Sequence, residues 1–163
     1  MTDLKPLTVS AIPTALERAE HYRALNEPSG AESICRDVLR ADSENQRALV
    51  LLILSLTDQF VRGVPVTEPC ALIKRLTADY ERVYYEGIIN ERQGKAQLHR
   101  GTPGSAANAH DWLSKAMTSY ERAEAIRPAG NDDAILRWNA CARVLRNHEL
   151  GPRSRDAVEH PIE

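Results

Sequence analysis

The stretch AMTSYERAEAIRP, residues 116–128, places small and bulky side chains at helical spacing and ends at a proline. The residues that make this pattern are Ala116, Tyr120, Ala123, Ile126 and Pro128. Residues 31–42, AESICRDVLRAD, carry the same spaced pattern of small and bulky residues. A second helical run follows each copy at once, so the sequence predicts a helix-turn-helix unit that occurs twice.

The later copy resembles the tetratricopeptide repeat, a helix-turn-helix unit of about 34 residues. Its residues fall where that repeat places a small residue, an aromatic, a second small residue, an apolar residue and a helix-ending proline. The resemblance implies an all-α fold of stacked antiparallel helix pairs, forming a right-handed superhelix of about three repeats plus a terminal helix. It also implies a concave surface that binds other proteins and has no chemistry of its own.

The resemblance covers most of residues 13–148 but departs from the family pattern in the middle. Residues 62–69, RGVPVTEP, form a longer break than the tight turn of the repeat allows. Asn90 stands where an aromatic residue is usual, so its amide is expected either to be hydrogen-bonded or to face the groove. Members of the family that bind an acidic chain terminus use lysine and asparagine, whereas the matching positions here are Leu16, Glu20 and Leu51. That mode of binding is not supported.

Prolines, glycines and capping patterns divide the chain into helices. The predicted helices cover residues 13–25, 30–41, 44–61, 106–127 and, after a cap at residues 131–133, the run to about 147. Ser29 with Glu32 and Ser43 with Gln46 are expected to form capping boxes. A helical stripe also follows Leu72, and Thr77 is a candidate cap for a new helix there.

These helices give the expected domain organisation. Residues 1–12 are predicted to be an N-terminal arm, residues 13–149 a helical repeat domain and residues 150–163 a disordered C-terminal tail. The boundaries between residues 62 and 80 stay open, because the glycines and prolines there interrupt the periodicity.

The composition excludes several classes of partner. The 163 residues include 21 basic and 23 acidic side chains, so the chain lacks the positive field that nucleic-acid binding requires. The longest apolar run, residues 48–54, is too short to cross a membrane, and the first residues lack the pattern of a signal segment. We therefore expect a cytoplasmic protein without nucleic-acid or membrane partners.

Residues with chemical potential are scattered along the chain. No two of the five histidines share a helix face at metal-ligand spacing, and phosphate-loop and serine-nucleophile patterns are absent. Cys35, Cys70 and Cys141 lie within helical patterns and are expected to be reduced and buried. The sequence therefore predicts no enzyme, no catalytic residue, no metal and no cofactor.

Candidate ligand-binding residues follow from carrying over the family's concave-facing spacing, which includes Glu20 and Arg23 on the first helix. The candidates in the later units are Arg47, Tyr84, Glu91, Arg92, Asp132, Asn139 and Arg143. Arg92 and Arg143 are expected to hold a carboxylate by two-point contact. The alternative is that Glu91, Arg92, Asp132 and Arg143 pair with one another across neighbouring helices and only hold the stack together.

Three functions are compatible with this sequence. The first is a scaffold or adaptor that binds a protein or peptide segment through its concave face. The second is a structural protein that assembles with itself, for example as a homodimer, by burying the open faces of incomplete terminal repeats. The third is a small-molecule sensor or an enzyme with a site between helices.

Overall fold

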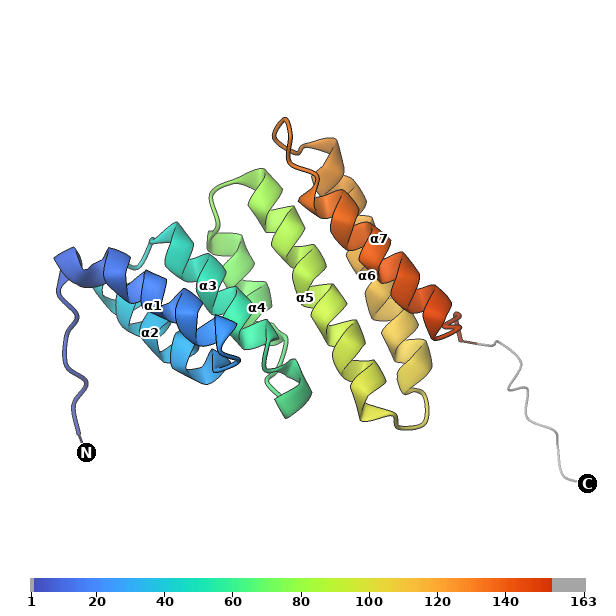
Figure 1. The fold of residues 1–163 in the computed structure, drawn as a ribbon, viewed down its shortest axis with the longest axis horizontal. Coiled ribbons are helices and arrows are strands. Elements are labelled where there is room, and N and C mark those ends of the chain that lie inside the picture. Colours follow the sequence, from blue (N-terminus) through green and yellow to red (C-terminus); the bar gives the residue numbers. More distant parts are fainter. Residues whose placement is uncertain (1, 154–163) are drawn as a thin grey trace, which may run out of the picture.

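The computed structural model describes residues 2–153, and over this range it contains helices and no strand (Figure 1). The α-helices are α1 (Ile12–Ala24), α2 (Pro28–Ala41), α3 (Gln46–Thr57), α4 (Thr67–Leu72), α5 (Asp79–Arg100), α6 (Ser105–Ala125) and α7 (Asp133–Asn147). Short 3-10 helices cover Val9–Ala11 (η1), Phe60–Arg62 (η2) and Ile73–Arg75 (η3). The all-α prediction is confirmed for the described residues. Most of the predicted C-terminal tail, residues 154–163, lies outside them.

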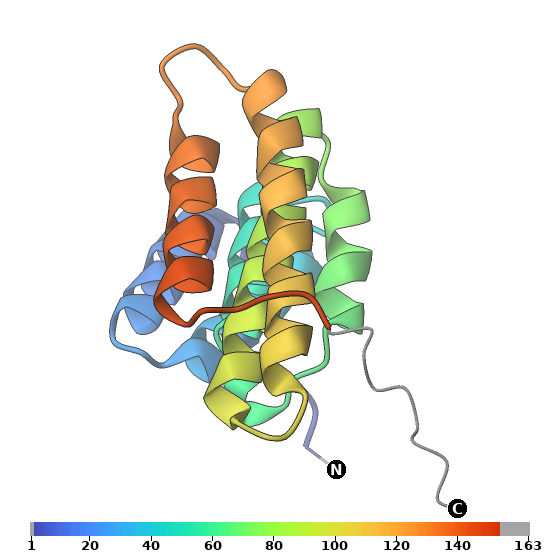
Figure 2. The same ribbon diagram turned by 90° about the vertical axis from the view of Figure 1, so that its right-hand side faces the viewer.

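The helices form two layers. In Figure 1, α1, α3, α5 and α7 lie nearer the viewer, and α2, α4 and α6 lie behind them. Helices next to each other in the chain pack as pairs, above all α5 with α6, α1 with α2, α2 with α3 and α6 with α7. Figure 2 turns this arrangement sideways, with α1 and α7 on its left and α4 on its right. We call the side formed by α1, α3, α5 and α7 the shared face.

The two predicted capping boxes are wrong, because neither Ser29 nor Ser43 caps a helix. Helix α2 begins at Pro28, whose ring lacks the N–H that a cap would satisfy, so Ser29 lies inside the first turn. Helix α3 begins at Gln46, and the side chain of Asn45 accepts a hydrogen bond from the Ala48 N–H at 2.9 Å. The residue that precedes α5 is Ala78 and not Thr77. At α7 the predicted cap is present in part, because Asn131 accepts from the Asp133 N–H at 3.0 Å.

The predicted break in the middle of the chain is confirmed. Between α3 and α5 the chain forms η2, a left-handed turn at Gly63, the six-residue helix α4 and then η3. Cys70 lies on the exposed side of this short helix, so the expectation that all three cysteines are buried is wrong for Cys70. Cys35 and Cys141 are buried as expected, and burial raises the pKa of each thiol to about 12.

The core consists of two apolar clusters, and α5 contributes to both. Ile89 and Ala96 of α5 pack in the cluster that α1, α2, α3 and α4 build. Ile88 of α5 packs in the cluster of α6 and α7 around Leu113 and Tyr120. Because successive residues of a helix point to different sides, one helix serves both clusters and joins the two halves of the protein.

Close packing of α5 on α6 depends on glycine. A Cβ atom on Gly87 would lie 2.4 Å from Cε1 of Tyr120, and one on Gly94 would lie 2.9 Å from Cγ of Leu113. Both distances are shorter than van der Waals contact, so any side chain at these positions would push the two helices apart. The buried Tyr120 ring therefore occupies space that only glycine leaves free.

We expect Gly87→Ala to lower the free energy of unfolding by about 1–3 kcal/mol, because the added methyl group overlaps a fully buried ring. Gly30→Ala is the matched control, since Gly30 is also helical and its added Cβ would lie 3.5 Å from Tyr22, an ordinary contact. The free energy of unfolding of the control is expected to rise by about 0.5 kcal/mol, because alanine lowers the entropy of the unfolded chain. Urea unfolding measures both variants, and equal stability of the two would contradict the overlap.

Candidate functional site

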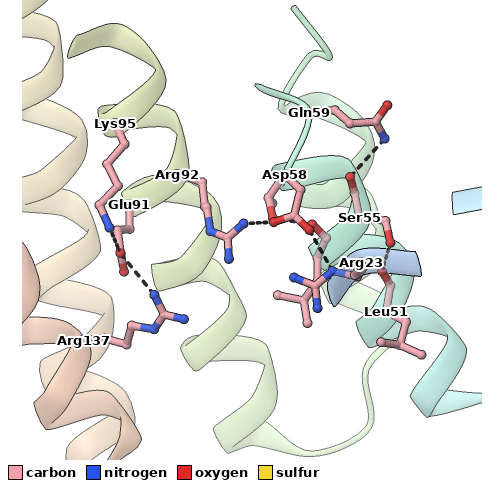
Figure 3. A network of polar contacts seen from close by, with 11 residues as sticks. Arg23, Leu51, Ser55, Asp58, Gln59, Glu91, Arg92, Lys95 and Arg137 are labelled. Carbon is pink, nitrogen blue, oxygen red and sulfur yellow. Dashed lines mark hydrogen bonds and ion pairs between the residues drawn. The ribbon is translucent and has the colours of Figure 1, made fainter. Parts of the chain in front are cut away.

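Two networks of charged side chains lie on the shared face (Figure 3). The first joins three helical segments through Asp58, the C-cap residue that directly follows α3. Arg23 of α1 donates its Nε–H to Oδ2 of Asp58 at 2.8 Å, and Arg92 of α5 donates through Nη1 to Oδ1. One carboxylate therefore lies between two guanidinium groups from different helices, each with about a quarter or less of its side chain exposed.

The second network is built around Glu91, whose side chain is fully buried. Its carboxylate accepts hydrogen bonds from Tyr120 Oη of α6 at 2.6 Å, from Lys95 Nζ of α5 at 2.5 Å and from Arg137 Nη1 of α7 at 3.3 Å. Removing a carboxylate from water is costly unless charges and donors compensate it. Two cations and a hydroxyl do so here, and they come from three helices.

The two networks lie side by side on α5, because Glu91 and Arg92 are consecutive residues whose side chains point in different directions (Figure 3). Burial, together with the nearby positive charges of Arg137 and Arg23, lowers the pKa of Arg92 to about 10. Burial and the charge of Glu91 raise the pKa of Tyr120 above its ordinary value of 10. The face thus holds several cations close enough to repel one another.

A cavity of about 450 Å³ opens beside Asp58. We call it the arginine pocket, and its lining residues are Arg23, Asn26, Pro28, Thr57, Asp58, Phe60, Val61, Arg92, Lys95, Ala96 and His99. Asn26 adopts a left-handed backbone conformation (φ 59°), which asparagine tolerates better than most residues, and so allows the tight turn from α1 to α2. Arg23, near the end of α1, reaches Asp58 at the edge of this cavity.

The structure places the predicted ligand-binding residues in different parts of the molecule. Arg92 and Glu91 lie in the two networks, but Arg47 is at the start of α3, paired with Glu20 at 2.9 Å. Asp132 precedes α7 and pairs with Arg127 at 3.2 Å. Tyr84 lies half-buried between Tyr80 and Tyr85, with ring centroids 5.6 and 5.2 Å away.

Two candidates lie on α7, where Asn139 is half-buried and Arg143 is exposed. Arg143 makes no ion pair with another residue of the described range, and the guanidinium that shares Asp58 with Arg92 is that of Arg23. The predicted mutual pairing of Glu91, Arg92, Asp132 and Arg143 is wrong for these side chains, since each ion pair found for them has a partner outside that set.

Sequence reasoning missed Asp58, Lys95 and Arg137. Arg23, Asp58 and Arg92 are 35 and 34 residues apart, close to the length of the repeat that the sequence resembles. A search for opposite charges at this spacing could have found the first network. Arg137 lies 46 residues from Glu91, and no comparable signal pointed to it.

Comparisons of the chain with protein families, with curated proteins and with solved structures give no match. The resemblance to the tetratricopeptide repeat therefore remains a prediction, and what the structure supports is an all-α fold of packed helix pairs. Across residues 2–153, no helix has the length and apolar character needed to span a membrane.

We expect Glu91→Gln to lower the free energy of unfolding by about 1.5–3 kcal/mol, because charge-assisted hydrogen bonds from Tyr120, Lys95 and Arg137 are lost in a buried position. Glu86→Gln is the control on the same helix. Glu86 also bonds two α6 side chains, Ser119 and Arg122, but its side chain is 40% exposed. In chemical denaturation the control should lower the free energy of unfolding by less than about 1 kcal/mol. Equal losses of stability in the two variants would mean that the burial of Glu91 does not strengthen its hydrogen bonds.

The raised pKa of Tyr120 predicts a loss of stability in alkali. Below pH 10 both the folded and the unfolded chain hold the phenol proton. Above pH 10 only the unfolded state releases it, so the free energy of unfolding falls by about 1.4 kcal/mol per pH unit from this group. Tyr120→Phe should be less stable at pH 8 and lose stability less steeply above pH 10, as measured by urea unfolding at a series of pH values. A slope equal to that of the unmodified protein would refute the assignment.

Proposed function

We propose that the protein is a helical scaffold that binds a protein or peptide segment along its shared face and has no catalytic activity of its own. The observation that carries this proposal is the gathering of Arg23, Arg92, Lys95 and Arg137 on one face around two carboxylates. Within these two networks four cations face two carboxylates, which leaves a local excess of positive charge. A ligand that contacts α1, α3, α5 and α7 together can use it.

The apolar residues near these charges support the same proposal. Val50 and Leu54 of α3 and Tyr84 of α5 are half-buried, so each keeps part of its apolar surface accessible. Protein interfaces combine apolar and aromatic anchors with a polar surround, and arginine and tyrosine are enriched among them. The shared face offers both kinds of contact, which a helix or an extended segment can use.

Self-association is the competing function. Leu136 of the terminal helix α7 is 63% exposed, and a second copy could cover it. Light scattering at several protein concentrations separates the two functions. A mass that stays monomeric supports the scaffold, whereas a stable dimer that Leu136→Arg dissociates supports self-assembly.

We expect peptides selected from a displayed random-peptide library on the intact protein to lose most of their binding to Arg92→Gln. The expected loss is about tenfold or more, since charged hydrogen bonds at an interface are worth one or two powers of ten. Titration of synthetic copies of the selected peptides measures it. Arg122→Gln is the control, because Arg122 also pairs with a carboxylate but lies on α6, in the other layer.

Chemical unfolding of both variants accompanies the titrations, so that a loss of fold is not taken for a loss of binding. Selected peptides that bind Arg92→Gln as tightly as the intact protein, but bind Arg122→Gln weakly, would overturn the assignment of the shared face. A selection that enriches no peptide would also count against the scaffold function.

A further inference from the structure

We propose that the segment bound on the shared face is acidic and that it places a glutamate or aspartate carboxylate in the arginine pocket. This inference rests on the proposed function and goes further, because it names the chemistry of the partner. It differs from the family mode that the sequence does not support, since it uses Arg23, Arg92 and Lys95 and neither asparagine nor a chain terminus.

Unused hydrogen-bond donors are the first support. Arg23 bonds Asp58 through Nε and Arg92 bonds it through Nη1. Over residues 2–153, the two terminal nitrogens of Arg23, and Nε and Nη2 of Arg92, make no hydrogen bond. A guanidinium fork matches the two oxygens of a carboxylate, so a ligand carboxylate can bind beside Asp58 without breaking the existing pairs.

The charge balance of the pocket is the second support. Arg23, Arg92 and Lys95 line it together with one carboxylate, Asp58, and Lys95 also pairs with the buried Glu91. The cavity between α4 and α6 has a similar balance, with Lys74, Lys115 and Arg122 beside Glu86. The difference lies in solvation, because the side chain of Arg92 is 24% exposed whereas that of Arg122 is 59% exposed. Cations that are partly removed from water gain more from an added anion than solvated ones do.

Mutual repulsion of the cations points the same way. Burial, then Arg137 and then Arg23, lower the pKa of Arg92 to about 10, so Arg92 is repelled by a cation that lines the pocket and by one outside it. A ligand carboxylate reduces this repulsion between the cations. A basic or neutral segment does not, which gives the pocket selectivity as well as affinity.

Asp58 has a defined role in this inference. It neutralises part of the charge on Arg23 and Arg92 while no ligand is bound, and it repels an incoming carboxylate. Its removal therefore has the opposite effect from removal of an arginine. Asp58→Asn keeps the size of the side chain and one oxygen acceptor, so it tests the charge with little change in packing.

The test uses a fluorescein-labelled decapeptide of alternating Glu and Ala, and a matched decapeptide in which each Glu is replaced by Gln. Fluorescence anisotropy follows their binding to the full-length protein at low salt. We expect the Glu peptide to bind at least tenfold more tightly than the Gln peptide and to weaken as NaCl is added. Arg92→Gln should weaken the Glu peptide about tenfold, Asp58→Asn should strengthen it, and Lys115→Gln in the α4–α6 cavity should leave it unchanged.

Several outcomes would overturn the inference. Equal binding of the Glu and Gln peptides would show that no carboxylate is recognised, and weaker binding to a folded Asp58→Asn variant would contradict a ligand carboxylate beside Asp58 in the pocket. Displacement of the peptide by inorganic phosphate at equal concentration would mean that the pocket takes a free anion. If library selection yields neutral or basic peptides that depend on Arg92, the scaffold function stands and the acidic partner does not.

Discussion

The buried carboxylate of Glu91 is the interaction on which the C-terminal half of the structure depends. It lies where α5, α6 and α7 meet, and its partners come from all three helices. A carboxylate in this position is tolerated only while all of its donors are in place, so it restricts how the helices can be packed. Tyr120 reaches it because Gly87 leaves room for the ring. Arg137 reaches it from α7 and so adds a cation to the shared face.

Helix α5 connects this half to the rest of the protein. Ile88 and Ile89, which are adjacent in the chain, belong to different apolar clusters, and Glu91 and Arg92 belong to different polar networks. Helix α5 therefore makes apolar and charged contacts with both halves of the protein. Asp58 joins α3 to α5 through Arg92 and also pairs with Arg23 of α1, and about 20–24% of each of these side chains is exposed. Partial burial makes these ion pairs stronger than surface pairs and leaves them within reach of a ligand.

The sequence predicts the helices of this protein better than their ends. Periodic small and bulky residues depend on local spacing, and the runs around Ala31 and Ala116 are helical with those alanines fully buried. Helix caps depend on competition between neighbouring residues. Helix α2 begins at Pro28, and Asn45 caps α3, in place of the predicted caps Ser29 and Ser43. A proline in the first turn and an asparagine before it are each favourable starts for a helix. Such choices differ by about 1 kcal/mol, which a pattern of residue types does not resolve.

The candidate site could be predicted only in part, because it is built from pairs that lie far apart in the chain. Concave spacing selected Arg23, Glu91 and Arg92, but it could not show that Asp58 lies between two arginines or that Arg137 and not Arg143 approaches Glu91. The net charge of the chain did not predict this surface either. The whole chain carries a formal charge of −2, and yet Arg23, Arg92, Lys95 and Arg137 place more cations than carboxylates on one face. What a partner meets is the local arrangement of charge, because at physiological ionic strength charges more than about 8 Å away are largely screened. An acidic protein can therefore present a surface that favours acidic partners.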